Sequence, residues 1–219
     1  LGDKDEFVVR LSYTGEPAWI QALGSDSADW ALDVTPANDG HVIVTGRTKR
    51  RHAQRVDGFV VKMDSIDGSV IWAKEVGHEF INDHFYDVKA LGGDGYLLAG
   101  WSGANVMGVN EALVMLLNED GEKQFAFLLG GPGDDDAREI LFGANDKLYL
   151  AGNTRNIGAG AGDCFLARID VSQQIPTLDW FKTYGGAQEE SLQHATVTSD
   201  GSILMVGTTG SAGNAQDGF

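Results

Sequence analysis

The sequence predicts an all-β fold built from about four copies of one structural unit. Three observations support this prediction: sequence columns that recur with one period, short apolar runs, and Asp-Gly pairs between the runs. Of the 219 residues, 42% are hydrophobic and 22% are charged. The chain can therefore bury a core, and wholesale disorder is excluded.

The period is defined by a motif in which an acidic residue opens an apolar run. Its copies are Asp5–Leu11, Asp57–Met63, Glu111–Leu117 and Asp163–Ile169, and a fifth begins at Asp217-Gly218-Phe219, so the acidic residues lie 52 or 54 positions apart. Two more columns keep this period: glycines 46, 100, 152 and 207, each two residues before Thr or Ser, and the aromatic residues Trp19, Trp72, Phe125 and Trp180. The predicted repeat units are 5–56, 57–110, 111–162 and 163–216, with 217–219 as the start of a further unit.

Within each unit, the apolar runs are short and lie between turn residues, as is typical of strands. In the second full copy, strands are predicted at 85–91, 96–101, 113–117 and 124–129. Glycine reaches positive φ without a steric penalty, so tight turns are predicted at Asp39-Gly40, Asp67-Gly68, Asp94-Gly95, Asp120-Gly121 and Asp200-Gly201. The runs 42–44, 97–99, 148–150 and 203–206 are apolar without alternation, so we expect stacked sheets to cover both faces of that strand.

A repeat of this length with four antiparallel strands, one of them buried on both faces, predicts a β-propeller built of four-stranded antiparallel blades. The alternative is a β-sandwich, whose strands need not repeat in a fixed register. Because 217–219 repeats the position filled by 5–7, we expect a part of a larger propeller of about six to eight blades. Its open ends would expose apolar faces and strand edges, so the expected partners are further blades, another protein or a second copy of the chain.

The order of motifs resembles the SBBP-type β-propeller repeats of secreted and surface proteins. The resemblance covers essentially the whole chain and is carried by Gly130-Gly131 and Gly185-Gly186, by Asp94-Gly95 with Ala99-Gly100-Trp101-Ser102, by Asp57–Lys62, and by Asp67-Gly68 to Trp72. The third copy departs from the pattern, with Leu116 at the cationic position and Phe125 at the tryptophan position. The resemblance implies an interaction or adhesion module that is extracellular or at the cell surface.

Two segments, 14–19 and 67–72, also look like the tryptophan-docking turns of quinoprotein dehydrogenase propellers. That likeness implies a calcium-bound quinone and a catalytic aspartate, but no segment matches such a cofactor site. We therefore expect the recurring aromatic residues to pack between neighbouring blades.

Charge and composition exclude several classes of partner. The chain has 32 acidic and 16 basic residues, a formal net charge of −16. Binding to phosphate depends on cationic side chains that displace counterions, so no nucleic-acid partner is expected. No apolar run approaches the roughly 18 residues of a membrane helix, so no membrane insertion is expected. Cys164 is the single cysteine, so an internal disulfide and a cysteine-based zinc site are excluded.

Two acidic columns are the candidates for a metal site. The first comprises Asp29, Asp83, Asp135 and Glu190, and the second comprises Asp33, Asp87, Glu139 and His194. Carboxylates that recur at one height could converge on calcium, the one cofactor considered. The alternative, which a once-per-repeat residue favours, is that each acid accepts hydrogen bonds within its own blade and fixes the loop before the innermost strand. Arg10, Lys62 and Arg168 recur with the same period and are candidate partners.

A basic loop is the candidate for partner binding. The segment 47–55 contains Arg47, Lys49, Arg50, Arg51 and Arg55, whereas the equivalent segments of the other repeats are nearly uncharged. An exposed basic loop on an acidic body can bind a carboxylate, a sulfate or an acidic protein surface; the alternative is a solvated loop without a partner.

No motif for nucleophilic, phosphate-binding or dinucleotide-binding chemistry is present, and no catalytic residue is assigned. We expect a non-enzymatic propeller that acts as a scaffold or adhesion module of a larger assembly, with contacts made by its loops. The alternatives are a lectin-like propeller that binds carbohydrate or calcium, and a fragment of a propeller enzyme.

Overall fold

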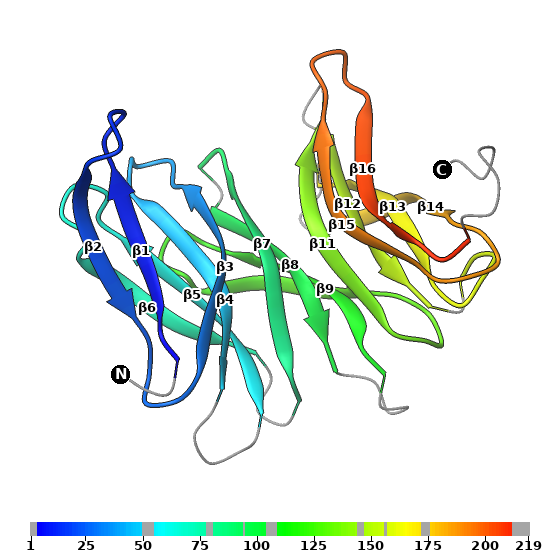
Figure 1. Ribbon diagram of the computed structural model, residues 1–219, viewed down its shortest axis with the longest axis horizontal. Coiled ribbons are helices and arrows are strands. Elements are labelled where there is room, and N and C mark those ends of the chain that lie inside the picture. The colour runs from blue at the N-terminus through cyan, green and yellow to red at the C-terminus, as the bar shows by residue number, and fades with distance from the viewer. Residues whose placement is uncertain are drawn as a thin grey trace. The chain divides into compact units, whose positions relative to one another are not determined.

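The described part of the chain consists of strands (Figure 1). The computed structural model describes residues 4–49, 55–77, 81–93, 95–103, 109–143, 147–155, 157–171 and 176–211. In these residues, 16 strands form antiparallel sheets. They include no helix that is long and apolar enough to cross a membrane. The predicted all-β class is confirmed.

The strands form three sheets of four and two sheets of two, and neighbouring strands in each sheet follow one another in the chain. The first two-stranded sheet is β1 (Glu6–Leu11) and β2 (Pro17–Leu23). The four-stranded sheets are β3 (Asp29–Pro36), β4 (Val42–Lys49), β5 (Val56–Met63) and β6 (Val70–Val76); β7 (Asp83–Leu91), β8 (Gly95–Ser102), β9 (Glu111–Leu117) and β10 (Lys123–Leu129); and β11 (Asp135–Phe142), β12 (Leu148–Thr154), β13 (Asp163–Asp170) and β14 (Thr177–Tyr184). The last sheet is β15 (Glu190–Val197) and β16 (Ile203–Thr209).

Each four-stranded sheet takes two strands from one sequence repeat and two from the next, because a repeat begins at the third strand of a sheet. The strands predicted at 85–91, 96–101, 113–117 and 124–129 are confirmed as β7 to β10. None of the described sheets closes on itself, and β1–β2 and β15–β16 are separate sheets. The predicted fifth copy at 217–219 lies outside the described residues.

The chain divides into two compact units, Leu1–Leu98 with Met115–Ala126 and Ala99–Val114 with Phe127–Phe219. In the first unit, β3 and β4 pack against β7. In the second unit, β11 and β12 pack against β15. Within each unit, the first strand of one sheet therefore lies against the first three strands of the preceding sheet.

The first two strands of a sheet share one register and one β-bulge. The acidic residue that opens the first strand faces a threonine: Asp29 faces Thr48, Asp135 faces Thr154 and Glu190 faces Thr209. Two residues later, Ala31, Ala137 or Leu192 faces a glycine, and the register then shifts by one residue. The sequence columns therefore occupy equivalent places in both units.

The glycine of the Gly-x-Thr motif is required by this bulge. A Cβ atom at Gly46 would lie 1.9 Å from the carbonyl oxygen of Trp30. At Gly152 and Gly207, a Cβ atom would lie 1.9 Å and 2.1 Å from the carbonyl oxygens of Asp136 and Ser191. Because those oxygens belong to the opposite strand, a side chain would force the two strands apart.

The third and fourth strands also repeat their register. Arg10 faces Trp19, Lys62 faces Trp72 and Arg168 faces Trp180, and a register shift follows each pair. In the first unit, the Trp19 ring lies against Gly68, where a Cβ atom would be 2.8 Å from the ring, and the Trp72 ring lies against Gly121, where it would be 3.0 Å away. The expected packing of these tryptophans between consecutive sheets is confirmed there.

The Asp-Gly turns are confirmed by positive φ angles at their glycines. The values are 87° at Gly40, 77° at Gly68, 103° at Gly95, 76° at Gly121 and 83° at Gly201. Asp94 itself lies outside the described residues.

Three of the four strands expected to be buried on both faces are buried. Ile43, Leu98 and Leu150 have no exposed surface. The expectation is wrong for 203–206, because Leu204 and Val206 in β16 are 56% and 61% exposed. The sheet β15–β16 packs against β11–β14 on one face, and these two side chains lie on the other.

Replacing Gly46 with alanine tests the bulge. We expect the Gly46→Ala variant to lose roughly 1–3 kcal/mol of unfolding free energy, because the added Cβ overpacks a position bounded by backbone. Urea denaturation measures this loss. Gly92→Ala is the control, since no atom lies within 4 Å of its added Cβ; an equal loss in both variants would contradict the explanation.

Candidate functional site

A row of buried carboxylates and hydroxyls crosses the sheets at the end where their first strands begin. In the second unit it contains Asp135, Thr154, Asp163 and Glu190, which are 2%, 1%, 1% and 3% exposed. Asp135, Thr154 and Asp163 are register partners on β11, β12 and β13, so their side chains share one face of the sheet. We call these residues the acid–hydroxyl row. In the first unit, Asp29, Thr48 and Asp57 occupy the equivalent places.

Three calcium candidates of the first acidic column hold the loop that precedes their strand. The backbone N–H of Ser25 donates to Asp29 at 2.6 Å, that of Gly131 to Asp135 at 2.8 Å, and that of Gly186 to Glu190 at 2.7 Å. In every case the donor is four residues before the acceptor. These hydrogen bonds follow the pattern expected if each acid fixes the loop before its own strand and does not bind calcium. For Asp83, the residue four positions earlier, Glu79, lies outside the described residues.

The hydrogen bonds and the burial act in opposite directions on these acids. Burial disfavours the charged form of Glu190, but hydrogen bonds from Gly186, Ser211 and Thr209 outweigh it and hold the pKa of Glu190 below its usual value. Burial raises the pKa of Asp135, and the nearby charge of Glu111 raises it further against the hydrogen bond from Gly131. The balance between burial and hydrogen bonding therefore differs between the equivalent positions of Glu190 and Asp135.

A second carboxylate lies beside each of three acids of that column, and a glycine leaves room for both. A Cβ atom at Gly130 would lie 2.1 Å from Glu111 Oε2 and 2.4 Å from Asp135 Oδ2. A Cβ atom at Gly185 would lie 2.2 Å from Asp163 Oδ1 and 2.6 Å from Glu190 Oε2. The same arrangement joins Asp57 and Asp83 at Gly77, at 3.3 Å and 2.7 Å. We call these the carboxylate pairs.

Sequence reasoning missed the carboxylate pairs. The acids that open the third strands, Asp57, Glu111 and Asp163, served to define the period and were not considered as site residues. The signal was present, because a glycine stands five or six residues before each acid of the first column, at 24, 77, 130 and 185.

The second acidic column joins consecutive sheets. In the first unit, the backbone N–H of Val88 in β7 donates to Asp33 Oδ2 at 3.0 Å, and Lys89 lies between Asp33 and Asp87. In the second unit, His194 of β15 contacts Glu139 of β11. Asp33, Glu139 and His194 directly follow the register shifts in β3, β11 and β15.

The cationic column has other partners than the acidic columns. Arg10 donates to the carbonyl oxygen of Ser65, and Arg168 forms an ion pair with Asp179 at 2.6 Å. Lys62 is buried and contacts Asp39 at 2.7 Å and Glu119 at 3.3 Å. Burial opposes the charge of Lys62, but its hydrogen bonds to these partners and Tyr96 raise its pKa.

The basic loop is only partly described. Arg50 and Arg51 lie outside the described residues. Arg47 stacks on Trp30, with its guanidinium carbon 4.5 Å from the ring centroid, so it is held by the sheet. Lys49 is exposed at the end of β4, and Arg55 is half-buried. The structure thus ties Arg47 to the sheet and leaves Lys49 facing solvent.

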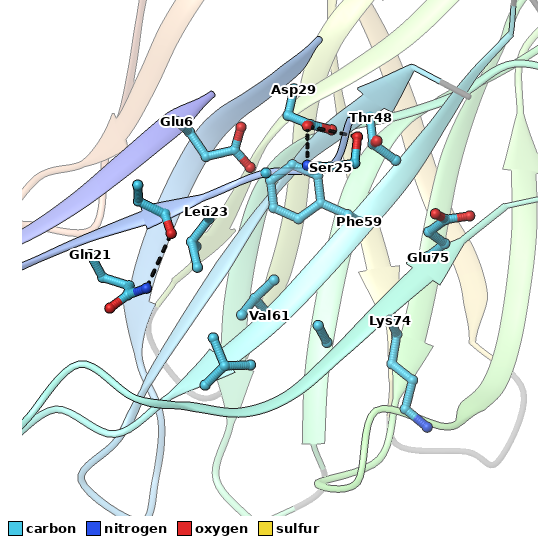
Figure 2. Close-up of a pocket in the computed structure, with 14 residues that line it drawn as sticks. Glu6, Gln21, Leu23, Ser25, Asp29, Thr48, Phe59, Val61, Lys74 and Glu75 are labelled. Carbon is cyan, nitrogen blue, oxygen red and sulfur yellow. Dashed lines mark hydrogen bonds between the residues drawn. The ribbon is translucent and has the colours of Figure 1, made fainter. Parts of the chain in front are cut away.

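A pocket of about 470 Å³ lies between β1–β2 and the face of β3–β6 (Figure 2). Leu23, Phe59 and Val61 give it an apolar side, and Glu6 and Asp29 lie together at its acidic end. Burial and the charge of Asp29 raise the pKa of Glu6 to about 7. The pocket can therefore bind a ligand with an apolar face and with donors for two carboxyl groups.

The described residues hold no group of three or more His, Cys, Asp or Glu side chains that could bind a metal ion. Comparison of the sequence with models of known protein families and with curated proteins finds no match.

Replacing Glu6 with glutamine tests the acidic end of the pocket. Because the pKa of Glu6 is higher in the folded chain than in the unfolded chain, the folded state retains its proton and loses stability as pH rises from about 4.5 to about 7. We expect unfolding free energy, measured in urea, to fall less for Glu6→Gln than for the unmodified chain across that range. The exposed Glu16→Gln variant controls for the change in net charge; a pH-independent difference would contradict the assignment.

Proposed function

We propose that the sheets are blades of a β-propeller of the SBBP repeat type, and that the chain is a non-enzymatic scaffold or interaction module of a larger extracellular or surface assembly. The supporting observation is the shared register of the sheets. The bulge opposite glycine recurs in β3–β4, β11–β12 and β15–β16, and the cation facing tryptophan recurs in β1–β2, β5–β6 and β13–β14. Propeller blades repeat in this way because each has the same neighbours.

The edge of β1 suits a strand from a further blade. In complete sheets, Gly46 faces Phe59 and Gly152 faces Phe165, and these rings are 7% and 1% exposed. Phe7 holds the equivalent place on β1 and is 70% exposed. A strand with a Gly-x-Thr motif would cover Phe7 and pair with the free edge of β1, so a further blade half is the partner that this edge fits.

The distribution of polar groups favours binding over catalysis. The acids of the first column hold loops in the same way in several sheets, and a group with one structural task in each repeat is not specialised for a reaction. The exposed Lys49 and the basic segment that follows it stand on an acidic body. Such a loop suits an anionic partner, which includes a second copy of the chain.

A second candidate function is carbohydrate binding. The pocket beside Glu6 and Asp29 supports it, because carboxylates accept hydrogen bonds from sugar hydroxyls and Phe59 offers an apolar surface. Charge on the basic loop would contribute nothing to this binding.

Binding of the Lys49→Ser/Arg50→Ser/Arg51→Ser variant tests the proposal. Immobilised heparin serves as the sulfated probe, and sedimentation velocity measures self-association. We expect the unmodified chain to bind in at least one assay, and the variant to lose most of that binding with little change in Tm, because the substitutions remove positive charge that attracts an anionic partner.

The matched control is Lys4→Ser/Lys123→Ser/Lys147→Ser, which removes the same charge from exposed positions. Equal weakening in both variants, or no binding by the unmodified chain, would contradict the proposal. Recognition of a neutral glycan on an array, unaffected by either variant, would favour the second candidate function.

A further inference from the structure

Three buried carboxylates of the second unit have no cationic partner. Within the described residues, no Lys or Arg forms an ion pair with Asp135, Asp163 or Glu190, although each is at most 3% exposed. The nearby Arg138 and Arg155 pair instead with Asp136 and Glu189. Burial of ionised groups is unfavourable unless hydrogen bonds or opposite charge compensate it, and a bound cation would supply the opposite charge.

Two of these carboxylates meet beside Gly185. Asp163 Oδ1 and Glu190 Oε2 lie 2.2 Å and 2.6 Å from the position that a Cβ atom would take there. Asp163 Oδ1 is buried and has no hydrogen-bond partner. This unpaired oxygen therefore lies close to a second buried carboxylate, and the missing side chain at residue 185 leaves room for both oxygen atoms.

The loops on either side hold both groups as acceptors. Asp163 Oδ2 accepts hydrogen bonds from the backbone N–H groups of Ala159 at 3.1 Å and Gly160 at 3.4 Å. Glu190 accepts one from Gly186 at 2.7 Å and one from the Thr209 hydroxyl at 2.7 Å. Hydrogen bonds of this kind fix the direction of the remaining oxygen lone pairs.

We propose that Asp163 and Glu190 bind a calcium ion beside Gly185. Two carboxylates provide the hard oxygen ligands that calcium prefers, and water would complete its coordination. With two protein carboxylates, we expect a Kd of about 10⁻⁴ to 10⁻³ M, as in extracellular calcium modules. The carboxylate pairs at Gly130 and Gly77 have the same construction, so more than one ion is expected to bind. The inference does not depend on the function proposed above.

Calorimetric titration of the metal-free chain with CaCl2 tests the site. We expect saturable binding, and the stoichiometry should fall by one ion in each of the Asp163→Asn and Glu190→Gln variants. At a calcium concentration about 100-fold above Kd, Tm of the unmodified chain should rise by roughly 5 to 10 °C.

The calcium-free proteins provide a second readout. Asp163→Asn removes one charge of the pair and should raise Tm in the absence of calcium, whereas the loss of a merely structural hydrogen bond would lower it. Asp179→Asn is the matched control: Asp179 lies on β14 and pairs with Arg168, so it should keep the full calcium stoichiometry.

Three results would overturn the proposal. The first is no binding heat and no change in Tm with calcium, which decides the matter on the unmodified chain even if a variant does not fold. The second is an unchanged stoichiometry in Asp163→Asn. The third is a Tm that does not change with calcium concentration but rises as pH falls from about 7 to about 5. That result would mean that a shared proton neutralises the pair.

Discussion

The close contact between a glycine and the opposite strand at the β-bulge is the constraint on which the other features depend. At Gly46, Gly152 and Gly207, the absence of a Cβ atom lets a carbonyl oxygen come within about 2 Å of the place a side chain would start. The bulge that results changes the register after Ala31, Ala137 and Leu192. One extra residue in a strand reverses the faces on which all later side chains lie. Side chains before and after the bulge therefore point to opposite faces of the sheet.

This constraint explains the concentration of buried polar groups at one end of the sheets. The acid before the bulge is fixed opposite a threonine and receives an N–H from its own loop, so its position is set locally. The acid that opens the third strand is set by a different pairing, that of Thr154 with Asp163. The two sets of carboxylates come together beside Gly77, Gly130 and Gly185, where the missing side chain leaves room for their oxygen atoms. The main unfavourable contribution at this end of the structure is the close approach of buried carboxylates.

Much of the architecture followed from the sequence. The strands 85–91 and 96–101 agree with β7 and β8 within two residues, and the Asp-Gly turns have the expected positive φ. These features depend on apolar runs and on glycine conformations, which are determined by residues close together in the sequence. The run 203–206 was expected to be covered on both faces, yet Leu204 and Val206 are exposed, as was expected only of the open ends of a larger propeller. An apolar run reports that a strand can be covered, but whether a second sheet covers it depends on elements distant in the chain.

The sequence by itself determined the repeat, the all-β class and the residues that recur in each copy. It could do so because the same local pattern of apolar runs and turn residues occurs in four copies. Only the tertiary structure decided which columns meet. Asp163 and Glu190 are 27 residues apart and belong to different strands and different columns, yet the loop at Gly185 brings them together. Lys62 was predicted to pair with the acidic columns, but it contacts Asp39 and Glu119 instead. A period fixes the height of a residue in a repeat, whereas its contacts depend on the pairing register and on the packing of one sheet on the next.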